Sequence, residues 1–344
     1  MANRLKDIAD ELGVSVSTVS RVANGKHNVS PSTEKLVKKA LARHQYMPNQ
    51  VARSLKKRST HTIGVIVPDI SDYFTTVVKG IDRVASQNGY SMILSDSNEL
   101  PETEEKYLRL LFEKRIDGLV LATVSTEHKA LHLYKENNVP VVYIDNLPNL
   151  DYGYDCVLID NRRAGYMAVS HLLSCGHRNI AIITGSKHET TGLERLEGYN
   201  EALTRFGLPV QPELIKYGNY KEDAGYSDMM ELLENRENAP FTAVFVGSFK
   251  MTCGAIAALN EKGLKIPDDI SLMGFDFTDK TMLIQPKITT ILQPEDAIGR
   301  MVAELLISRI NAIQDTEHSN IYVPQRIMLD PILQVNNSCS IIRR

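Results

Sequence analysis

Residues 61–344 alternate short apolar runs with amphipathic helical segments, and this alternation restricts the possible folds more than any other feature of the chain. In the first unit an apolar run at residues 63–67 ends at Pro68-Asp69, and a helical pattern through Val77 and Ile81 follows as far as Gly89. Similar runs occupy residues 91–94, 118–122, 139–144, 180–184, 243–247 and 271–275. Strands that alternate with helices predict parallel sheets with right-handed crossovers, so this part of the chain is expected to have an α/β fold.

The first 46 residues follow a helical period instead. The apolar residues of the first predicted helix are Leu5, Ile8, Ala9 and Leu12. Gly13 follows directly, where a left-handed φ commonly ends a helix, and Ser15 can cap a second helix with its hydroxyl. The apolar residues of that second helix, expected to face the first helix, are Val16, Val19 and Val22. The sequence therefore predicts two helices joined by a short turn.

A third amphipathic helix is predicted from Ser30-Pro31 onward, because proline is favoured in a first helical turn. Its apolar stripe is Leu36, Val37, Ala40 and Leu41. The pattern breaks at Pro48, since the residue before a proline is pushed out of the helical region. Residues 49–58 offer about two helical turns without an apolar face long enough to fold alone, so we expect them to become helical only on a partner.

The second predicted helix exposes polar and basic side chains where a protein core would need apolar ones. These side chains are Ser17, Thr18, Ser20 and Arg21. Residues 1–60 also hold 12 Lys or Arg against 4 Asp or Glu, whereas the remainder holds 27 against 38. A helix, a glycine turn and an exposed polar helix are typical of the helix-turn-helix, and a basic segment beside an acidic body is typical of a chain that meets a polyanion at one end. The N-terminal residues are therefore predicted to bind DNA.

Two motifs connect the chain to a known family. L-x-D-I-A-x-x-x-G-V-S-x-x-T-V-S-R-V-x-N-G begins at Leu5, and Y-x-P-N-x-V-A-R-S-L begins at Tyr46. With these motifs the chain resembles the lactose/galactose repressor family of bacterial transcription regulators, and the similarity continues through nearly the whole chain.

The resemblance implies that the second helix enters the major groove of DNA. The implied base readers are Val16, Ser17 and Arg21, with His27 as a weaker candidate. Phosphate contacts or register are implied for Leu5, Ser15, Thr18, Asn24, Asn28, Tyr46 and Asn49. Arg21 is suited to a bidentate contact with a guanine edge, whereas Val16 can make only an apolar contact, for example with a thymine methyl group. Leu55 matches the leucine that the family inserts into the minor groove at the operator centre, which unstacks a base step and bends the DNA.

For residues 61–344 the resemblance implies the periplasmic sugar-binding fold. In this fold two Rossmann-like subdomains are joined by three crossover strands, here near residues 158–162, 288–294 and 322–326. The expected domains are a helix-turn-helix domain at 1–46, a hinge helix or linker at 47–60, and an effector-binding and dimerisation core at 61–344. The N-subdomain is expected at about 61–160 plus 291–322, and the C-subdomain at about 161–290 plus 323–344.

Ligands of open α/β sheets bind outside the carboxyl ends of the strands, so the residues that follow the strands are the candidates for effector binding. By resemblance, Arg195 in the segment R-x-x-G-Y and Asp276 in M-G-F-D are the polar clamps, and Tyr220 is the stacking aromatic. Such groups suit a sugar, because arginine and carboxylates bind hydroxyl groups and an aromatic ring covers an apolar sugar face. The predicted effector site is Tyr73, Phe74, Asp145, Asp160, Thr191, Arg195, Tyr220, Ser248 and Asp276.

Three departures from the family pattern bear on the effector. Ser248-Phe249 stands where the family usually has an acidic residue, which speaks against an ordinary hexose. Glu189 stands where the purine-responsive branch has an arginine, which weakens the alternative of a purine corepressor. Glu304 aligns with a basic residue of the catabolite-control branch, whose signal is a phosphorylated carrier protein, and a like charge there disfavours such a partner. The prediction is a repressor controlled by a sugar or sugar derivative, with the purine and the carrier protein as alternatives.

No enzyme and no cofactor are predicted. The chain lacks G-x-G-x-x-G after its first strand, and it lacks the P-loop, H-E-x-x-H and G-x-S-x-G motifs. Its four cysteines, Cys156, Cys175, Cys253 and Cys339, are far apart and without C-x-x-C spacing, so neither a disulfide framework nor a metal site is expected.

The remaining expectations concern location and assembly. Charges interrupt the N-terminus where a signal peptide needs an apolar stretch, and the longest apolar runs are strand-sized, which predicts a cytoplasmic protein with no membrane span. A three-helix module reads only one half-site, so we expect a homodimer on a pseudo-palindromic, double-stranded operator. Residues 327–344 contain Pro331 and no sustained leucine repeat, so a tetramer-forming coiled coil is not expected.

Overall fold

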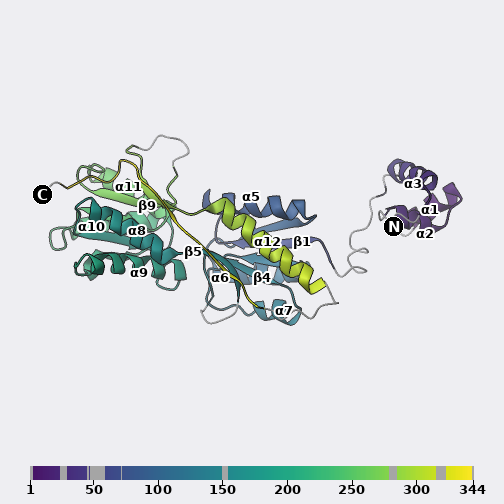
Figure 1. Cartoon of the computed structure of the whole chain (residues 1–344), viewed down its shortest axis with the longest axis horizontal. Coiled ribbons are helices and arrows are strands. Elements are labelled where there is room, and N and C mark those ends of the chain that lie inside the picture. Colours follow the sequence, from purple (N-terminus) through teal and green to yellow (C-terminus); the bar gives the residue numbers. More distant parts are fainter. Residues whose placement is uncertain are drawn as a thin grey trace. The chain divides into compact units, whose positions relative to one another are not determined.

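The structure is a computed structural model, and it describes residues 3–23, 29–44, 46, 59–70, 72–148, 154–278, 285–314 and 323–342. These residues belong to two compact units, Met1–Thr60 and His61–Arg344, which are described separately here (Figure 1).

The first unit contains the three predicted helices, α1 (Asn3–Leu12), α2 (Val16–Ala23) and α3 (Pro31–Arg43). Gly13 has a φ of +63°, which allows the tight turn between α1 and α2. The buried core of this unit is Ile8, Ala9, Val19, Val22, Val37 and Ala40. The helix-turn-helix prediction is therefore confirmed.

Two residues expected in the apolar stripes of this unit are instead exposed. Val16 is 44% exposed and Leu36 is 51% exposed. Val16 is the first residue of α2, one turn before the buried Val19, and lies at the end of the stripe. Leu36 is rotated by about 100° from the buried Val37, which takes its side chain off the buried face of α3. The core of the module is thus narrower than the periodicity predicted.

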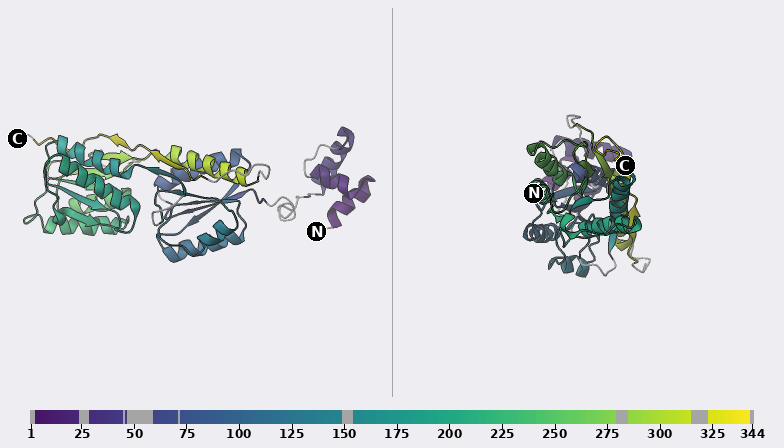
Figure 2. Two further views of the ribbon diagram at one scale, coloured as in Figure 1. Left: turned by 60° about the horizontal axis from the view of Figure 1, so that its bottom comes forward. Right: turned by 90° about the vertical axis from the view of Figure 1, so that its left-hand side faces the viewer.

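The second unit contains two six-stranded sheets. The first sheet has the order β11-β5-β4-β3-β1-β2, and all of its neighbouring strands are parallel. Its strands are β1 (Thr62–Val67), β2 (Ser91–Asp96), β3 (Gly118–Leu121), β4 (Val141–Ile144), β5 (Asp155–Ile159) and β11 (Arg326–Leu329). One face packs against α5 (Asp72–Gln87) and α12 (Glu295–Gln314), and the other against α6 (Pro101–Glu113) and α7 (Leu131–Glu136), as Figure 2 shows.

The second sheet has the order β12-β10-β9-β8-β6-β7 and is parallel except for the antiparallel pair β10-β12. Its strands are β6 (Ile180–Thr184), β7 (Ile215–Tyr217), β8 (Ala243–Val246), β9 (Ser271–Phe275), β10 (Thr289–Leu292) and β12 (Ile332–Gln334). One face packs against α8 (Asn161–Ser174) and α9 (Thr190–Arg205), and the other against α10 (Glu222–Glu234) and α11 (Phe249–Glu261); the short helix η1 (Pro212–Leu214) precedes β7. The predicted core of two Rossmann-like subdomains is confirmed.

The chain passes three times between the two sheets. It passes from β5 to α8, from β10 to α12, and from β11 to β12. The last passage lies at residues 329–332, later than the expected 322–326, because β11 pairs in parallel with β5 of the first sheet. Residues 323–329 therefore belong to the N-subdomain rather than the C-subdomain, and residues 291 and 292 of β10 belong to the C-subdomain. Apolar periodicity could not place β10 and β11, because a strand of four residues is too short to show a period.

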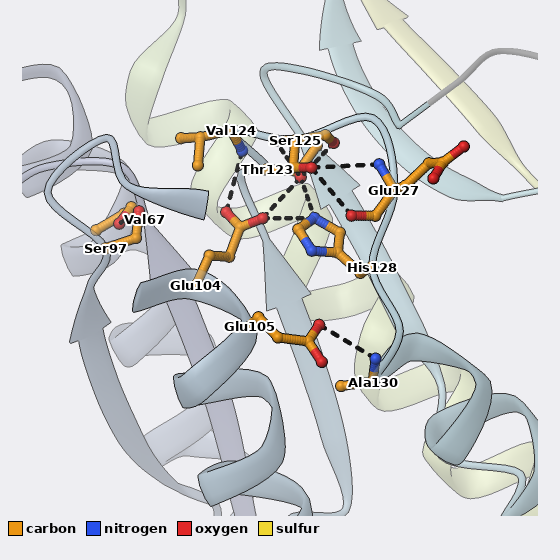
Figure 3. A network of polar contacts seen from close by, with 10 residues as sticks. All are labelled: Val67, Ser97, Glu104, Glu105, Thr123, Val124, Ser125, Glu127, His128 and Ala130. Atoms are coloured by element: carbon orange, nitrogen blue, oxygen red, sulfur yellow. Dashed lines mark hydrogen bonds and ion pairs between the residues drawn. The ribbon is translucent and has the colours of Figure 1, made fainter. Parts of the chain in front are cut away.

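A buried polar cluster holds the loop that follows β3 (Figure 3). Glu104 of α6 is 0% exposed, and its carboxylate accepts hydrogen bonds from the Thr123 hydroxyl at 2.9 Å and the Val124 N–H at 3.0 Å. The His128 Nε2 lies 2.6 Å from the Glu104 Oε1. Thr123 follows a strand, but its hydroxyl is hydrogen-bonded within this cluster and holds the loop.

Two classes of feature are missing from the part of the chain that the structure describes. No helix there has the length and apolar character needed to cross a membrane. No group of three or more His, Cys, Asp or Glu side chains in these ranges is placed to hold a metal ion.

Candidate functional site

The exposed face of α2 is the candidate DNA-contacting surface. Val16, Ser17 and Arg21 are all exposed, although two valines of the same helix are buried. The Ser15 hydroxyl accepts a hydrogen bond from the Thr18 N–H at 3.2 Å, so Ser15 caps the helix as its position predicted. The cap fixes the start of α2 and leaves the side chains of Ser17 and Arg21 free of core packing.

The other predicted DNA contacts divide into two groups. Leu5 and Tyr46 are partly buried against the three-helix core, so they support the module as well as lying at its surface. Asn24, His27, Asn28, Asn49 and Leu55 lie outside the described residues. The roles assigned to all of these residues stay predictions.

The second candidate site is a cavity at the carboxyl ends of the strands of both sheets. It contains about 690 Å³ of empty space, part of it open to solvent. Its walls are Pro68, Asp69, Tyr73, Phe74, Glu99, Asp145, Asn146, Glu189, Thr191, Arg195, Tyr220, Ser248, Phe249, Lys250, Phe275, Asp276 and Gln293. Eight of the nine predicted effector-site residues are among them, all except Asp160.

Arg195 occupies the base of the cavity. It belongs to α9 and is only 3% exposed. Its Nε donates to the Asn161 Oδ1 at 2.9 Å and its Nη1 donates to the Gly247 carbonyl at 2.6 Å. The guanidinium carbon lies 3.6 Å from the centre of the Phe275 ring, which is a cation–π contact. These contacts hold the guanidinium in one orientation.

Asp276 follows β9 and is held by Gln293, which follows β10. The Gln293 backbone N–H donates to one carboxylate oxygen at 2.9 Å and its side-chain amide donates to the other at 2.6 Å. Burial raises the pKa of Asp276 to about 7, although Gln293 and Arg195 both act to lower it. Gln293 was not predicted as a site residue, and its position directly after a strand was the available signal.

Three of the predicted effector-site residues have left-handed backbone conformations. Asp145, Tyr220 and Asp276 have φ values of +63°, +62° and +51°. Such values are costly for residues other than glycine and concentrate at functional sites. The Tyr220 hydroxyl lies 2.7 Å from the Thr191 hydroxyl, so these two predicted residues contact each other across the C-subdomain wall.

Asp160 and Ser248 both serve as helix caps. The Asp160 carboxylate accepts from the Arg163 N–H at 2.8 Å at the start of α8, and Asp160 is absent from the cavity wall. An aspartate that follows a strand is often only a helix N-cap, and that is its role here. Ser248 caps α11 through the Met251 N–H at 3.3 Å and also lines the cavity.

Four charged wall residues, Asp69, Glu99, Glu189 and Lys250, were not predicted as site residues. Glu99 lies beyond the end of β2 and has a φ of +59°, and Lys250 lies in the first turn of α11. The Lys250 ammonium group donates to the Asp69 carboxylate. Glu99 is the third residue after the end of β2, and no motif in the sequence marks it.

Asn146 links the two subdomains at the cavity. Its amide nitrogen donates to the Asp145 carboxylate at 3.3 Å and to the Glu189 carboxylate at 3.2 Å. Its amide oxygen accepts from the Thr191 N–H at 3.2 Å. Asn146 follows β4 of the N-subdomain, whereas Glu189 and Thr191 lie at the start of α9, so one side chain spans both walls.

Glu99, Asp145 and Glu189, like Asp276, have raised pKa values. Burial raises the pKa of Glu99 to about 8, of Glu189 to about 7 and of Asp145 to about 6, and neighbouring carboxylates add to the effect in each case. Arg195 acts in the opposite direction on Asp145 and Glu189. Among the residues that the structure describes, the cavity therefore holds more acidic than cationic groups, and the acids with raised pKa values are partly protonated near pH 7.

Two family profiles match the chain. Residues 4–49 match the profile described as "Bacterial regulatory proteins, lacI family". Residues 60–328 match "Periplasmic binding proteins and sugar binding domain of LacI family". Together the two profiles cover both structural units.

Individual proteins agree with this assignment. The chain is 36% identical to Catabolite control protein A of Priestia megaterium, over 93% of this chain and 96% of that protein. It is also 36% identical to the HTH-type transcriptional repressor PurR of Glaesserella parasuis serovar 5 (strain SH0165), over 97% of each chain. Among solved structures, a lac repressor dimer bound to operator and the anti-inducer ONPF is similar with a TM-score of 0.81 and 26% identity, over 97% of this chain and 98% of that one.

The similarity to these regulators therefore extends over nearly the full length of the chain and includes both structural units. Such proteins bind DNA through the N-terminal helix-turn-helix and carry an effector-binding domain, and they are not enzymes. The chain belongs to the lacI family of bacterial regulatory proteins and is a DNA-binding transcriptional regulator.

Proposed function

We propose that this protein is a homodimeric repressor whose affinity for a pseudo-palindromic operator is controlled by a small molecule, a sugar or sugar derivative, bound in the cavity between its two subdomains. The observation that carries the proposal is the cavity wall, which takes residues from both sheets. A ligand that contacts both walls favours one angle between the subdomains, which is the requirement for a conformational signal.

The DNA-binding half of the proposal depends on α2. Arg21 is placed to read a guanine edge, and Val16 and Ser17 are exposed beside it for apolar and polar contacts. The helix is short, so one module covers one half-site, and two modules related by a two-fold axis are needed for tight binding. A lac repressor structure of similar fold is a dimer bound to operator, which supports the same assembly here.

The signal is proposed to pass through the three connections between the sheets. A change of angle between the subdomains changes the separation of the two residue 49–57 segments in the dimer. These segments are too short to be stable helices alone, so their separation decides whether they pack together on the operator. Effector and operator must then affect each other's affinity by the same factor, typically about 1–3 kcal/mol of coupling free energy.

Two alternatives follow from the relatives. A phosphorylated carrier protein is disfavoured, because Glu304 is exposed on α12 and repels a phosphate that approaches this face. A purine corepressor is weakened by Glu189, which places a carboxylate in the cavity wall where an arginine would stand. The identity to Catabolite control protein A and to PurR keeps both alternatives testable.

The experiment has two steps. DNA selected by the full-length protein from a random duplex library is sequenced, and the recovered duplex is then titrated with sugars, sugar phosphates and sugar acids present or absent. We expect a palindromic consensus and at least one compound that changes operator affinity five-fold or more. Selection without a consensus would exclude the DNA-binding proposal. An operator affinity that responds only to a phosphorylated protein would replace the small-molecule proposal by the carrier-protein alternative.

A further inference from the structure

We infer that the effector carries a positive charge, as a protonated amine on a hydroxyl-bearing ligand of the amino-sugar class. The inference rests on the proposed function, in which the cavity binds the effector, and adds the chemical class. Its basis is the number of acidic side chains in the cavity wall compared with the number of cationic ones.

Among the residues that the structure describes, the wall holds five carboxyl groups and two cationic side chains. The carboxyl groups are Asp69, Glu99, Asp145, Glu189 and Asp276, and the cations are Arg195 and Lys250. Lys250 is ion-paired with Asp69, so this pair neutralises itself. Arg195 is then the cation that remains for four carboxyl groups.

Arg195 directs its hydrogen bonds at neutral groups rather than at these carboxylates. Its donors reach Asn161 and Gly247, and the Phe275 ring covers one face of the guanidinium. Among the described residues, Arg195 forms no ion pair with a carboxylate. The positive charge of Arg195 therefore stabilises the ionised forms of Asp145, Glu189 and Asp276 through space, without an ion pair to any one of them.

The four carboxyl groups come from opposite walls. Glu99 and Asp145 follow strands of the N-subdomain, whereas Glu189 and Asp276 follow strands of the C-subdomain. One carboxylate from each wall accepts a hydrogen bond from the same donor, because the Asn146 amide nitrogen donates to both Asp145 and Glu189. An ammonium group brings three N–H donors and a full positive charge to such a place. It would bind both walls and favour their approach.

Aromatic residues in the same wall favour a cation as well. Tyr73 and Phe74 pack edge to face with ring centres 4.7 Å apart, and Tyr220 and Phe249 also line the cavity. Aromatic faces attract ammonium groups and also cover the apolar faces of sugar rings. The raised pKa values of Glu99, Glu189 and Asp276 agree with a wall whose counter-charge comes from a ligand. A bound amine lowers these pKa values, so its binding releases protons near neutral pH.

The test uses matched pairs of sugars on the full-length protein. D-glucosamine is compared with D-glucose, D-galactosamine with D-galactose and D-mannosamine with D-mannose, by thermal shift and by calorimetry in two buffers of different ionisation enthalpy. The pH is 6.5, where the free amines are already protonated and any protons released come from the protein. We expect at least one amine to bind ten-fold or more tightly than its hydroxyl partner, with release of protons. The Glu189→Gln variant should reduce that preference ten-fold or more. The matched control, Glu197→Gln, changes an exposed carboxylate on the same helix and should leave the preference intact.

The outcomes separate the inference from the proposed function. If a neutral or anionic sugar derivative binds, changes operator affinity and is not surpassed by an amine, the proposed function stands and the inference is overturned. The inference is also overturned if none of the three amines binds, or if Glu189→Gln keeps the full preference for an amine. An amine that binds with proton release but leaves operator affinity unchanged supports the inference and contradicts the proposed control of DNA binding.

Discussion

The Nε of Arg195 on α9 donates a hydrogen bond of 2.9 Å to the Oδ1 of Asn161, the first residue of α8. Asn161 lies directly after the first passage between the two sheets, since β5 ends at Ile159. The residue at the base of the cavity is therefore hydrogen-bonded to the connection that relates the subdomains. A ligand that shifts Arg195 acts on that connection directly.

Replacing Arg195 should uncouple effector from operator. We expect Arg195→Ala to remove the effector response, a loss of about 1–3 kcal/mol of coupling, while effector-free operator affinity stays within two-fold. The measurement is operator titration with and without the effector found by the sugar panel. Arg162→Ala, which changes an exposed arginine of α8, is the control and should respond normally. A full response in Arg195→Ala would remove the cavity from the mechanism.

Replacing Arg21 should change base preference. We expect Arg21→Ala to lose about 1–3 kcal/mol of discrimination at one base pair of each half-site, because a bidentate contact to guanine is lost. Lys38→Ala is the matched control, since Lys38 is exposed on α3 and paired with Glu34 of the same helix. The measurement is affinity for all four base pairs at each operator position. An equal loss for every base variant would show that Arg21 contacts phosphate instead.

Replacing Leu55 should weaken specific binding without unfolding the helix-turn-helix. Leu55→Ala removes the side chain proposed to enter the minor groove, whereas the groups that contact phosphates remain. Specific affinity should fall while affinity for non-operator duplex barely changes. DNA bending, measured by energy transfer between the operator ends, should decrease. Parental bending in the variant would contradict the proposed role.

The empty protein should lose stability as the pH rises. Acids with raised pKa values in the folded state bind protons that the unfolded chain has already released, so the free energy of unfolding falls between about pH 5 and pH 8. Glu99, with a pKa of about 8, and Glu189, with a pKa of about 7, contribute in this window. Urea denaturation at pH 5.5 and pH 8 should show a smaller decrease for Glu189→Gln than for the parent. An unchanged decrease would show that Glu189 does not carry this dependence.

The buried cluster behind β3 should matter for stability and not for DNA recognition. His128→Ala removes a donor from the buried Glu104 carboxylate, which should cost about 1–3 kcal/mol of unfolding free energy. Denaturant unfolding measures this cost, and His188→Ala, a change at an exposed histidine, is the control. Operator preference should be the same in both variants. A shifted preference in His128→Ala would connect this loop with DNA binding.

Local patterns in the sequence were sufficient for much of the fold. The i, i+3, i+4 spacing of Leu5, Ile8 and Ala9, the cap at Ser15 and the glycine at position 13 define the first two helices through interactions only a few residues apart. The apolar runs of β1, β6 and β9 are equally local, because a strand buried on both faces needs apolar side chains throughout. Arg195 and Asp276 were identified through the resemblance to the family, and Asp276 also follows a strand at the edge of a sheet where ligands bind.

Only the tertiary structure decided the features that depend on residues far apart in the chain. The place of β11 in the first sheet depends on its pairing with β5, more than 160 residues earlier, and a four-residue strand carries no local signal of its partner. Glu99 joins the cavity because a left-handed backbone turns it there, and Asp160 leaves it because its carboxylate caps α8. The sequence thus determined the kinds of side chain present. Their burial beside one another, and with it the excess of acidic over cationic groups in the cavity, arises only when both sheets have folded and been connected.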